Sequence, residues 1–364
     1  MMTNKLLTIV SPCYNEIKNI DYLIEKLEAA DPNSIISRLI FVDDDSPDGT
    51  SEYVKGLPDR KFDVLCLRRI GRQGLSSAVI EGILLADTKF VAVMDADGQH
   101  DPRDLIAMCE KMTSQNIQFI VGSRFINSDL VESHVGFRAH ISNIGNRIAN
   151  KILGRNLTDP LTGFFIFERQ IFLESIKKIR PSGFKILLDL LYQLKGSNLR
   201  VEEYPITFKV RHGGESKLDS KVLIEFADQI VGFITKGALP EKLFSFILVG
   251  SIGLIIHLTL LYCFLFFLQL EFIDAQILAT LVSMISNFSL NNVLTFRRNR
   301  LKGLRWLLGL FAFILVCSLG ALANVGVAGY LFGLGREWWI SGLLGVLVGT
   351  VFNFSLSKFY IWKP

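Results

Sequence analysis

The chain has 364 residues, half of them apolar, and a formal net charge of +4. So small a positive charge gives no reason to expect a nucleic acid as a partner. The mean hydropathy is +0.37, and the apolar excess is concentrated in the last third of the chain, which is atypical of a purely soluble protein. We expect a cytosolic domain over 1–217, an interfacial region over 218–240 and a membrane domain over 241–364.

Strands and helices alternate over the first third of the sequence. The predicted strands are 6–10, 39–42, 64–67, 90–94 and 119–121, with helices between them. Repeated β–α units predict a mostly parallel sheet covered by helices, a Rossmann-like α/β fold. Ligands of such sheets bind outside the carboxyl ends of the strands, so the loops after the strands form the candidate site.

Four predicted strands end in polar loops, at 11–16, 43–49, 71–77 and 95–99. Taken singly, each loop also fits an ordinary turn or a helix start. The three adjacent acids at 43–45 repel one another, however, and rarely occur together without compensation. Taken together, the loops therefore predict hydroxyl donors from a ribose or base, and a metal, at this edge of the sheet.

Asp95, Asp97 and Gln99 alternate after an apolar run, so their side chains leave the same face of the chain. Carboxylate and amide oxygens are hard donors that suit Mg²⁺ or Mn²⁺ bridging a diphosphate. The sequence therefore predicts a divalent metal site formed by these three residues.

Two helices are predicted to face lipid ahead of the membrane domain. The helix at 137–153 carries Arg138, Arg147 and Lys151, and the helix at 218–237 has its apolar residues largely on one side. Because 218–237 directly precedes the first span, we expect it to lie at the membrane interface. The alternative is an ordinary amphipathic helix packed on the sheet.

Four apolar stretches are each long enough to cross a bilayer, and the predicted spans are 243–268, 273–295, 305–332 and 338–360. The connection at 297–305 is rich in Lys and Arg, whereas the first connection carries Glu271 and Asp274 and no base. Because basic loops face inward, we expect this loop and both termini on the cytosolic side. No secretory signal is recognisable before the first strand. The five cysteines include no Cys-x-x-Cys pair, which is typical of reduced thiols.

The membrane domain contains an internal repeat. Residues 244–253 match 311–320 at seven of ten positions, and Asn-Phe-Ser-Leu at 287–290 recurs at 353–356. The sequence therefore predicts a duplicated hairpin, 243–296 and 305–362, with both copies in one orientation. We expect Asn287 and Asn353 either to bond across the repeat axis or to line a polar path.

Seven motifs carry a family resemblance: SPCYNE (11–16), VDDDSPDGT (42–50), GLSSA (74–78), DADGQH (95–100), GSRF (122–125), DPLTGFF (159–165) and RHGGESK (211–217). In this order they resemble dolichol-phosphate mannose synthases and their polyprenyl-phosphate glycosyltransferase relatives. Those proteins are inverting enzymes of the GT-A fold, in glycosyltransferase family 2. The membrane part resembles the four-helix GtrA-like family, which some of these enzymes carry fused.

The resemblance implies a role for each matching residue. The nucleoside is expected to bind Pro12, Tyr14, Glu16, Val42 and Asp44, and the metal and donor diphosphate to bind Asp95, Asp97 and Gln99. The acceptor phosphate is expected to bind Arg124, Arg138, Arg211 and Lys217, close to the reacting atoms. Gly213 stands where some relatives carry a second Arg, so we expect the acceptor clamp to be one charge lighter.

A phosphate-monoester acceptor is largely dianionic at neutral pH and is already a nucleophile, so no general base is required. None of the five histidines has an obvious catalytic partner in the sequence. The reaction instead needs charge stabilisation on the leaving diphosphate, which a divalent metal and Arg or Lys side chains supply.

We therefore expect an inverting hexosyltransferase that moves mannose from GDP-mannose to dolichyl or polyprenyl phosphate at the cytosolic face. That membrane is the plasma membrane in a prokaryote and the endoplasmic reticulum in a eukaryote. The alternatives are UDP-glucose as donor, a processive polysaccharide synthase, and a lipid-linked sugar flippase. A processive synthase requires Gln-x-x-Arg-Trp, and Lys302 occupies the Gln position before Arg305 and Trp306. The oligomeric state stays open.

Overall fold

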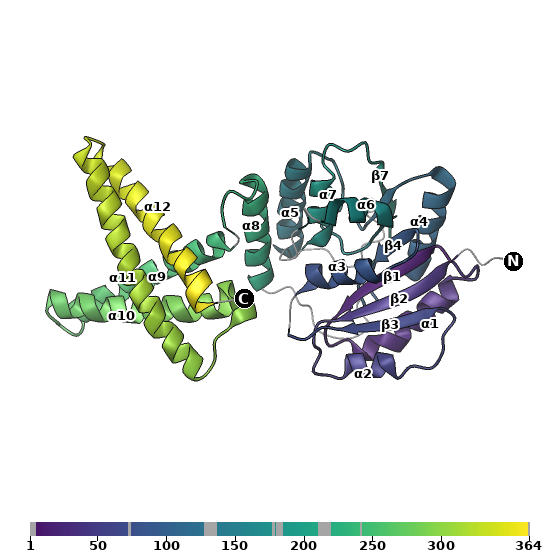
Figure 1. Ribbon diagram of the computed structural model, residues 1–364, viewed down its shortest axis with the longest axis horizontal. Helices are drawn as coiled ribbons and strands as arrows, with labels where there is room; N and C mark the ends of the chain where they lie inside the picture. The colour runs from purple at the N-terminus through teal and green to yellow at the C-terminus, as the bar shows by residue number, and fades with distance from the viewer. Residues whose placement is uncertain are drawn as a thin grey trace. The chain divides into compact units, whose positions relative to one another are not determined.

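The computed structural model describes residues 5–71, 74–126, 137–176, 179, 185–209, 220–240 and 242–362. The chain divides into two compact units, Met1–Asp219 and Ser220–Pro364. The first is an α/β unit, and in the second the described secondary structure consists of helices joined by short connections (Figure 1).

The first unit contains a seven-stranded sheet with the strand order β3-β2-β1-β4-β6-β5-β7. Neighbouring strands run parallel, except that β6 is antiparallel to both β4 and β5. The sheet is therefore mostly parallel, as the sequence predicts. The strands are β1 (Leu7–Cys13), β2 (Ile36–Asp43), β3 (Asp63–Arg68), β4 (Phe90–Val93), β5 (Phe119–Ser123), β6 (Phe165–Glu168) and β7 (Val201–Pro205).

Helices cover both faces of this sheet. Leu7 and Ile9 of β1 lie in a core with residues of α1 and α4, whereas Val10, on the opposite face, lies against Gly82 of α3. The helices of the first unit are α1 (Ile20–Ala30), α2 (Thr50–Lys55), α3 (Leu75–Leu85), α4 (Pro102–Gln115), α5 (Phe137–Leu153), α6 (Arg169–Ser175) and α7 (Ile186–Gln193). The alternation along β1 follows from strand geometry, since successive side chains point to opposite faces.

The five predicted strands are present as β1 to β5, but β6 and β7 were not predicted. β6 has only four residues, too short a run for the strand to be distinguished from a buried helix by its pattern. β7 contains two glutamates and ends in proline, residue types that are depleted in strands. It lies at an edge of the sheet, where these residues are tolerated.

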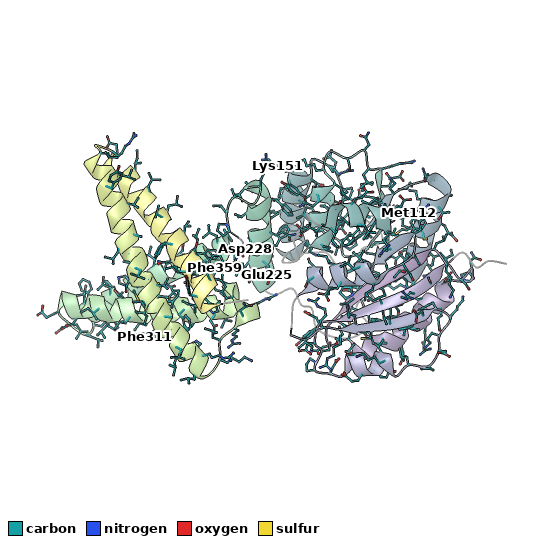
Figure 2. The ribbon with its side chains drawn as sticks, viewed as in Figure 1. Met112, Lys151, Glu225, Asp228, Phe311 and Phe359 are labelled. Carbon is teal, nitrogen blue, oxygen red and sulfur yellow. The ribbon has the colours of Figure 1, made fainter. Side chains whose placement is uncertain are left out.

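The second unit consists of α8 (Ser220–Ile234) and four long apolar helices, α9 (Leu243–Phe266), α10 (Phe272–Leu290), α11 (Leu304–Gly333) and α12 (Trp338–Leu356). Among the described residues, three segments are long and apolar enough to cross a membrane: Leu243–Phe266, Ile277–Thr295 and Leu304–Ala323. The fourth predicted span, which includes α12, stays a prediction. Phe311 and Phe359 are 74% and 65% exposed and project from the helices (Figure 2), as expected of lipid-facing side chains.

Polar contacts fix α8 to the membrane helices. Asp228 accepts a hydrogen bond from the backbone N–H of Ser245 (3.1 Å), in the first turn of α9, where helical N–H groups lack partners. Glu225 forms an ion pair with Arg297 (2.8 Å). Figure 2 labels both acids on α8. The predicted helix at 218–237 is thus present in the described range, and its place at a membrane interface stays a prediction.

The two repeats each contain the same asparagine–glycine contact. Asn287 of α10 lies against Gly253 of α9, and Asn353 of α12 lies against Gly320 of α11. A Cβ on either glycine would overlap the asparagine Oδ1, and both Oδ1 atoms are buried without a hydrogen-bond partner in the described structure. Each amide therefore packs within its own hairpin, and neither Oδ1 makes the predicted hydrogen bond across the repeat axis in the described structure.

We expect Gly320→Ala to destabilise the second hairpin by about 1–3 kcal/mol, because its methyl group must displace the Asn353 side chain. The melting temperature of the full chain in detergent measures this effect. Gly326→Ala in the same helix is the matched control, since nothing lies within 4 Å of its added Cβ. If both variants melt alike, or if Asn353→Ala fails to rescue Gly320→Ala, the contact does not hold the hairpin together.

Candidate active site

The loops after β1 and β2 are joined by hydrogen bonds at the carboxyl edge of the sheet. The N–H of Asp44 donates to the carbonyl of Cys13 (3.0 Å), and the N–H of Asn15 donates to Ser46 Oγ (2.9 Å). The N–H of Ile17 donates to Asp48 Oδ2 (3.2 Å). The two loops therefore form one connected surface, as the convergence of parallel strands predicts.

The three adjacent acids are compensated by the protein's own donors. Asp43 accepts hydrogen bonds from the N–H and hydroxyl of Ser46. Asp44 accepts from the N–H of Gly74 (2.9 Å) and lies 3.5 Å from the buried guanidinium of Arg69. Neighbouring loops therefore already supply donors to Asp43 and Asp44, and the contribution of ligand hydroxyls and a metal at this edge stays a prediction.

Arg69 is a buried residue that no pattern in the sequence singles out. Its Nη1 donates to the carbonyl of Gly74 (3.1 Å) and its Nη2 to Ser77 Oγ (2.7 Å). Its backbone N–H donates to the carbonyl of Asp43 (2.9 Å). One arginine thereby connects the loop after β2 to the start of α3, and it holds Asp44 in place.

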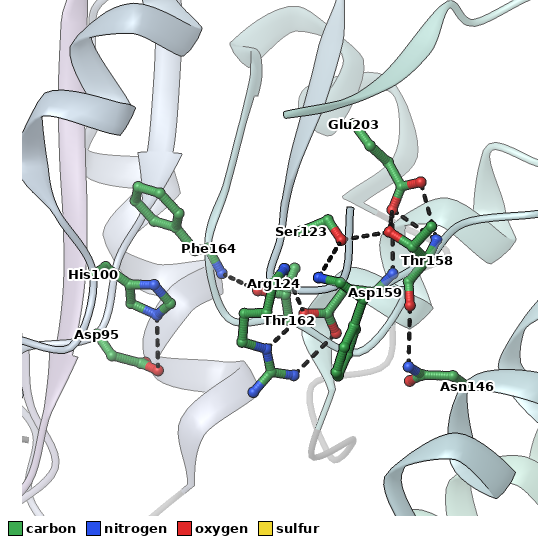
Figure 3. Close-up of polar contacts among 11 residues, drawn as sticks. Asp95, His100, Ser123, Arg124, Asn146, Thr158, Asp159, Thr162, Phe164 and Glu203 are labelled. Carbon is green, nitrogen blue, oxygen red and sulfur yellow. Dashed lines mark hydrogen bonds and ion pairs between the residues drawn. The ribbon is translucent and has the colours of Figure 1, made fainter. Parts of the chain in front are cut away.

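Asp95 follows β4, and its carboxylate faces His100 (Figure 3). Its Oδ2 is 3.9 Å from Nε2 of His100. A Cβ on Gly163 would come within 2.9 Å of the same oxygen. His100 is buried and stacks on Phe164, with ring centroids 4.5 Å apart. The glycine of the 159–165 motif therefore makes room for the Asp95 carboxylate, and the stacked ring flanks it.

Asp97 and Gln99 are held by backbone groups. The N–H of Gln99 donates to Asp97 Oδ1 (3.1 Å), and the Gln99 amide nitrogen donates to the carbonyl of Lys209 (3.2 Å). Because the amide nitrogen is engaged there, Oε1 is the atom of Gln99 suited to a cation. Gly98, between the two, has a φ of +75°, a left-handed conformation that glycine adopts without strain.

Lys209 also reaches the start of α4. Its Nζ pairs with Asp101 (2.8 Å), which caps the helix by accepting from the N–H of Arg103 (3.0 Å). Arg103, and then Lys209, hold the pKa of Asp101 well below its usual range. Because the folded pKa lies below the unfolded one, the charged pair stabilises the fold above about pH 4, and this contribution is lost as the pH falls further.

We expect Asp101→Asn to lower stability at neutral pH by about 1–2 kcal/mol, since asparagine keeps the helix cap but loses the charge-assisted bonds. The difference in melting temperature from the unmodified chain should shrink as the pH falls toward about 3. Asp59→Asn, at an exposed position, is the control. A difference that stays constant over this pH range would contradict the assignment.

Arg124 forms a buried ion pair with Asp159 (Figure 3). Its Nε lies 2.6 Å from Asp159 Oδ2 and its Nη2 3.0 Å from Oδ1, and Asp159 is fully buried. The guanidinium also lies 5.2 Å from the ring centroid of Phe208. Both nitrogens facing Asp159 are engaged, so the predicted phosphate contact of Arg124 falls to its remaining N–H groups.

A hydrogen-bond network supports Asp159 from behind. Glu203 of β7 accepts from the N–H groups of Thr158 (2.8 Å) and Asp159 (3.1 Å). Asn146 of α5 donates to the carbonyl of Thr158 (3.2 Å). Figure 3 shows these side chains approaching the loop from different elements. The loop that carries Asp159 is therefore fixed by both a strand and a helix.

Lys185 is the residue directly before α7. Burial and then the nearby Arg124 lower its pKa, while Asp95 and Asp159 act in the opposite direction. This electrostatic coupling connects Lys185 to both predicted groups of the site, the metal carboxylates and the phosphate-binding arginine. No pattern in the sequence indicates Lys185, because the groups that influence it come from distant loops.

The predicted nucleoside residues lie at the ends of β1 and β2. Pro12 pairs in register with Val42, Tyr14 is half-buried, and buried Glu16 accepts a hydrogen bond from Asn19 (2.7 Å). The Val42 side chain is fully buried and directed at Gly82 of α3. Any role of Val42 at the nucleoside therefore falls to its backbone.

Three predicted phosphate-binding residues fall where their side chains are not described. Arg138 lies in α5, and its side chain lies outside the described residues, as do Arg211 and Lys217. The predicted acceptor clamp is thus represented in the described structure by Arg124.

Two family models match the chain: glycosyl transferase family 2 over residues 8–175 and the GtrA/DPMS transmembrane domain over residues 245–362. A dolichol-phosphate mannosyltransferase from Pyrococcus furiosus is 31% identical over 359 residues, 98% of this chain and 99% of that protein. An undecaprenyl-phosphate mannosyltransferase from Micrococcus luteus is 31% identical over 228 residues, 61% of this chain and 90% of that protein.

Among solved structures, glucosyl-3-phosphoglycerate synthase from Mycobacterium tuberculosis, in complex with Mn²⁺, UDP and phosphoglyceric acid, aligns with a TM-score of 0.48 at 12% identity. The alignment covers 65% of this chain and 80% of that one.

The fold and the family models together define a glycosyltransferase with an α/β GT-A domain and a helical membrane domain. The match over nearly the whole length of both chains makes the identification more specific: the chain belongs to the family of dolichol-phosphate mannosyltransferases. The predicted fold class, family and enzyme class are thereby confirmed.

Proposed function

We propose that the protein transfers mannose from GDP-mannose to dolichyl or polyprenyl phosphate, with inversion at the anomeric carbon, at the cytosolic face of a membrane. The observation that carries this proposal is the full-length similarity to a dolichol-phosphate mannosyltransferase. The similarity to an undecaprenyl-phosphate mannosyltransferase supports the same sugar with a different isoprenoid.

The residues at the carboxyl end of β4 fit a divalent metal. Asp95, Asp97 and Gln99 offer two carboxylates and one amide oxygen, and Gln99 is held with its amide nitrogen turned to Lys209. Mg²⁺ is typically bound by one or two carboxylates together with waters and substrate phosphates, so a small donor set is sufficient. When bound, Mg²⁺ or Mn²⁺ neutralises the charge that develops on the leaving nucleoside diphosphate.

The protein's own side chains then position two anions beside each other. Asp44 is held by Arg69 and Gly74 at the place expected for the nucleoside. Arg124 is oriented by Asp159. The charges of Arg124, Asp95 and Asp159 all act on the pKa of Lys185. Because the acceptor phosphate is already a dianion near neutral pH, these residues need only bind and orient it, and no side chain has to remove a proton.

The donor is identified by incubating membranes that contain the protein with Mg²⁺ or Mn²⁺, polyprenyl phosphate and labelled GDP-mannose or UDP-glucose. Label that enters the organic phase from GDP-mannose alone supports the proposal. Label from UDP-glucose alone would show a glucosyltransferase, and label from neither would contradict both donors. The cytosolic location of the reaction is tested with sealed vesicles that receive the donor only on the outside. Transfer is measured separately for each orientation of the protein in the vesicle membrane.

A further inference from the structure

One end of the second unit carries cations to which the proposed sugar transfer assigns no role. We call three cations the basic turn: Arg300 and Lys302, which lie between α10 and α11, and Arg305 in the first turn of α11. All three side chains are exposed, and no described carboxylate forms an ion pair with them. Arg297, just before the turn, differs from them because Glu225 of α8 neutralises it at 2.8 Å. The basic turn is therefore a concentration of uncompensated positive charge.

The opposite end of the helices has the opposite charge. The connection between α9 and α10 and the start of α10 carry Glu271 and Asp274, and the connection between α11 and α12 carries Arg336 and Glu337. The two ends of these helices therefore differ in charge. The basic turn lies at the end where α10 finishes and α11 begins.

The basic turn is held in one shape by a buried asparagine. Asn292 donates to the carbonyl of Leu301 (3.0 Å) and accepts from its N–H (2.8 Å), a reciprocal pair. The same Asn292 oxygen accepts from the indole N–H of Trp362 (3.0 Å), whose ring stacks on Phe296 with centroids 4.4 Å apart. A loop that set membrane orientation through its charge alone would not need this rigid support, which is typical of a binding site.

Apolar side chains continue directly from the cations. Leu304, Leu307 and Leu308 are 71%, 57% and 64% exposed at the start of α11. Trp306, beside them, packs edge-on against Phe288 with centroids 5.4 Å apart. Cations bordering exposed leucines match a molecule with an anionic head and an apolar tail.

We propose that the basic turn binds the phosphate headgroups of acidic phospholipids, with their acyl chains along the first turns of α11. Each basic residue close to an anionic membrane surface contributes about 1 kcal/mol, or roughly fivefold in affinity. Three cations together therefore favour an acidic phospholipid over a neutral one by about a hundredfold. This preference should weaken as salt is raised, since the cations are exposed.

The test uses the full chain in neutral detergent and measures binding of fluorescent phosphatidylglycerol and fluorescent phosphatidylcholine at low and high salt. The triple variant Arg300→Gln/Lys302→Gln/Arg305→Gln should lose about a hundredfold in affinity for phosphatidylglycerol and little for phosphatidylcholine. Arg336→Gln, an exposed arginine in the opposite connection, is the matched control and should change neither. Arg300→Lys/Arg305→Lys should retain binding, because the charge is kept.

Several outcomes would overturn the proposal. One is an equal loss of affinity for phosphatidylglycerol in the triple variant and in Arg336→Gln. Another is an equal loss of affinity for both lipids in the triple variant. A third is the absence of phosphatidylglycerol binding in Arg300→Lys/Arg305→Lys. Displacement of phosphatidylglycerol by polyprenyl phosphate at a much lower concentration would show a surface for the acceptor instead. If the triple variant does not fold, Arg300→Gln and Arg305→Gln alone, each expected to lose about fivefold, decide the question.

Discussion

Replacing Asp97 by alanine is expected to reduce sugar transfer to polyprenyl phosphate by at least about a thousandfold, or ~4 kcal/mol of transition-state stabilisation. Asp97 is buried at the end of β4, and its carboxylate is oriented by the N–H of Gln99 at 3.1 Å. The substitution removes one of only two carboxylates in the predicted metal site. The loss should appear in kcat, because the charge that the site stabilises develops as the diphosphate leaves.

A second measurement separates this role from a general loss of structure. Binding of Mn²⁺ to the purified chain in the presence of a nucleoside diphosphate, followed by electron paramagnetic resonance, should be weakened in Asp97→Ala. Asp59→Ala, at an exposed position of the same unit, is the control and should leave both readouts unchanged. Full Mn²⁺ binding by Asp97→Ala, or transfer at the unmodified rate, would exclude Asp97 as a metal ligand.

Local patterns in the sequence predict the parts of the site that are near each other in the chain. Asp95, Asp97 and Gln99 are recognisable because they follow a buried strand, and the structure places them in the loop after β4. The strand ends at Val93 and the loop turns at Gly98, with a φ of +75°, so the predicted strand alternation does not extend to these three residues. The loops after β1 and β2 converge as parallel strands require. The convergence of the loops could be predicted because the direction of a parallel sheet is a nearly local property.

The parts that could not be predicted depend on contacts between distant segments. Arg124 and Asp159 are separated by 35 positions, and Gly163 accommodates Asp95 from a separate loop. No periodicity relates such residues, although the DPLTGFF motif that contains both Asp159 and Gly163 was a signal that could have found them. Similarly, the internal repeat identified Asn287 and Asn353, but only the structure shows a glycine as the partner of each.

The buried pair between Arg124 and Asp159 leads to the second large effect, on stability. Asp159→Ala is expected to destabilise the first unit by about 3–5 kcal/mol, because it leaves the guanidinium of Arg124 without its buried partner. Asp159 is fully buried, and both its oxygens accept from Arg124, at 2.6 and 3.0 Å. Thermal unfolding of the full chain in detergent, followed by circular dichroism, measures the change.

Asp63→Ala is the matched control, since Asp63 also pairs with an arginine, Arg38, at 2.6 Å, but is 55% exposed. Water and salt screen such a surface pair, so we expect about 0–1 kcal/mol. If Asp63→Ala and Asp159→Ala destabilise equally, burial does not set the strength of the pair. The double variant Arg124→Met/Asp159→Leu separates structure from chemistry: it removes both charges and should recover most of the stability. Transfer should nevertheless remain low, because the guanidinium that we propose binds the acceptor phosphate is gone.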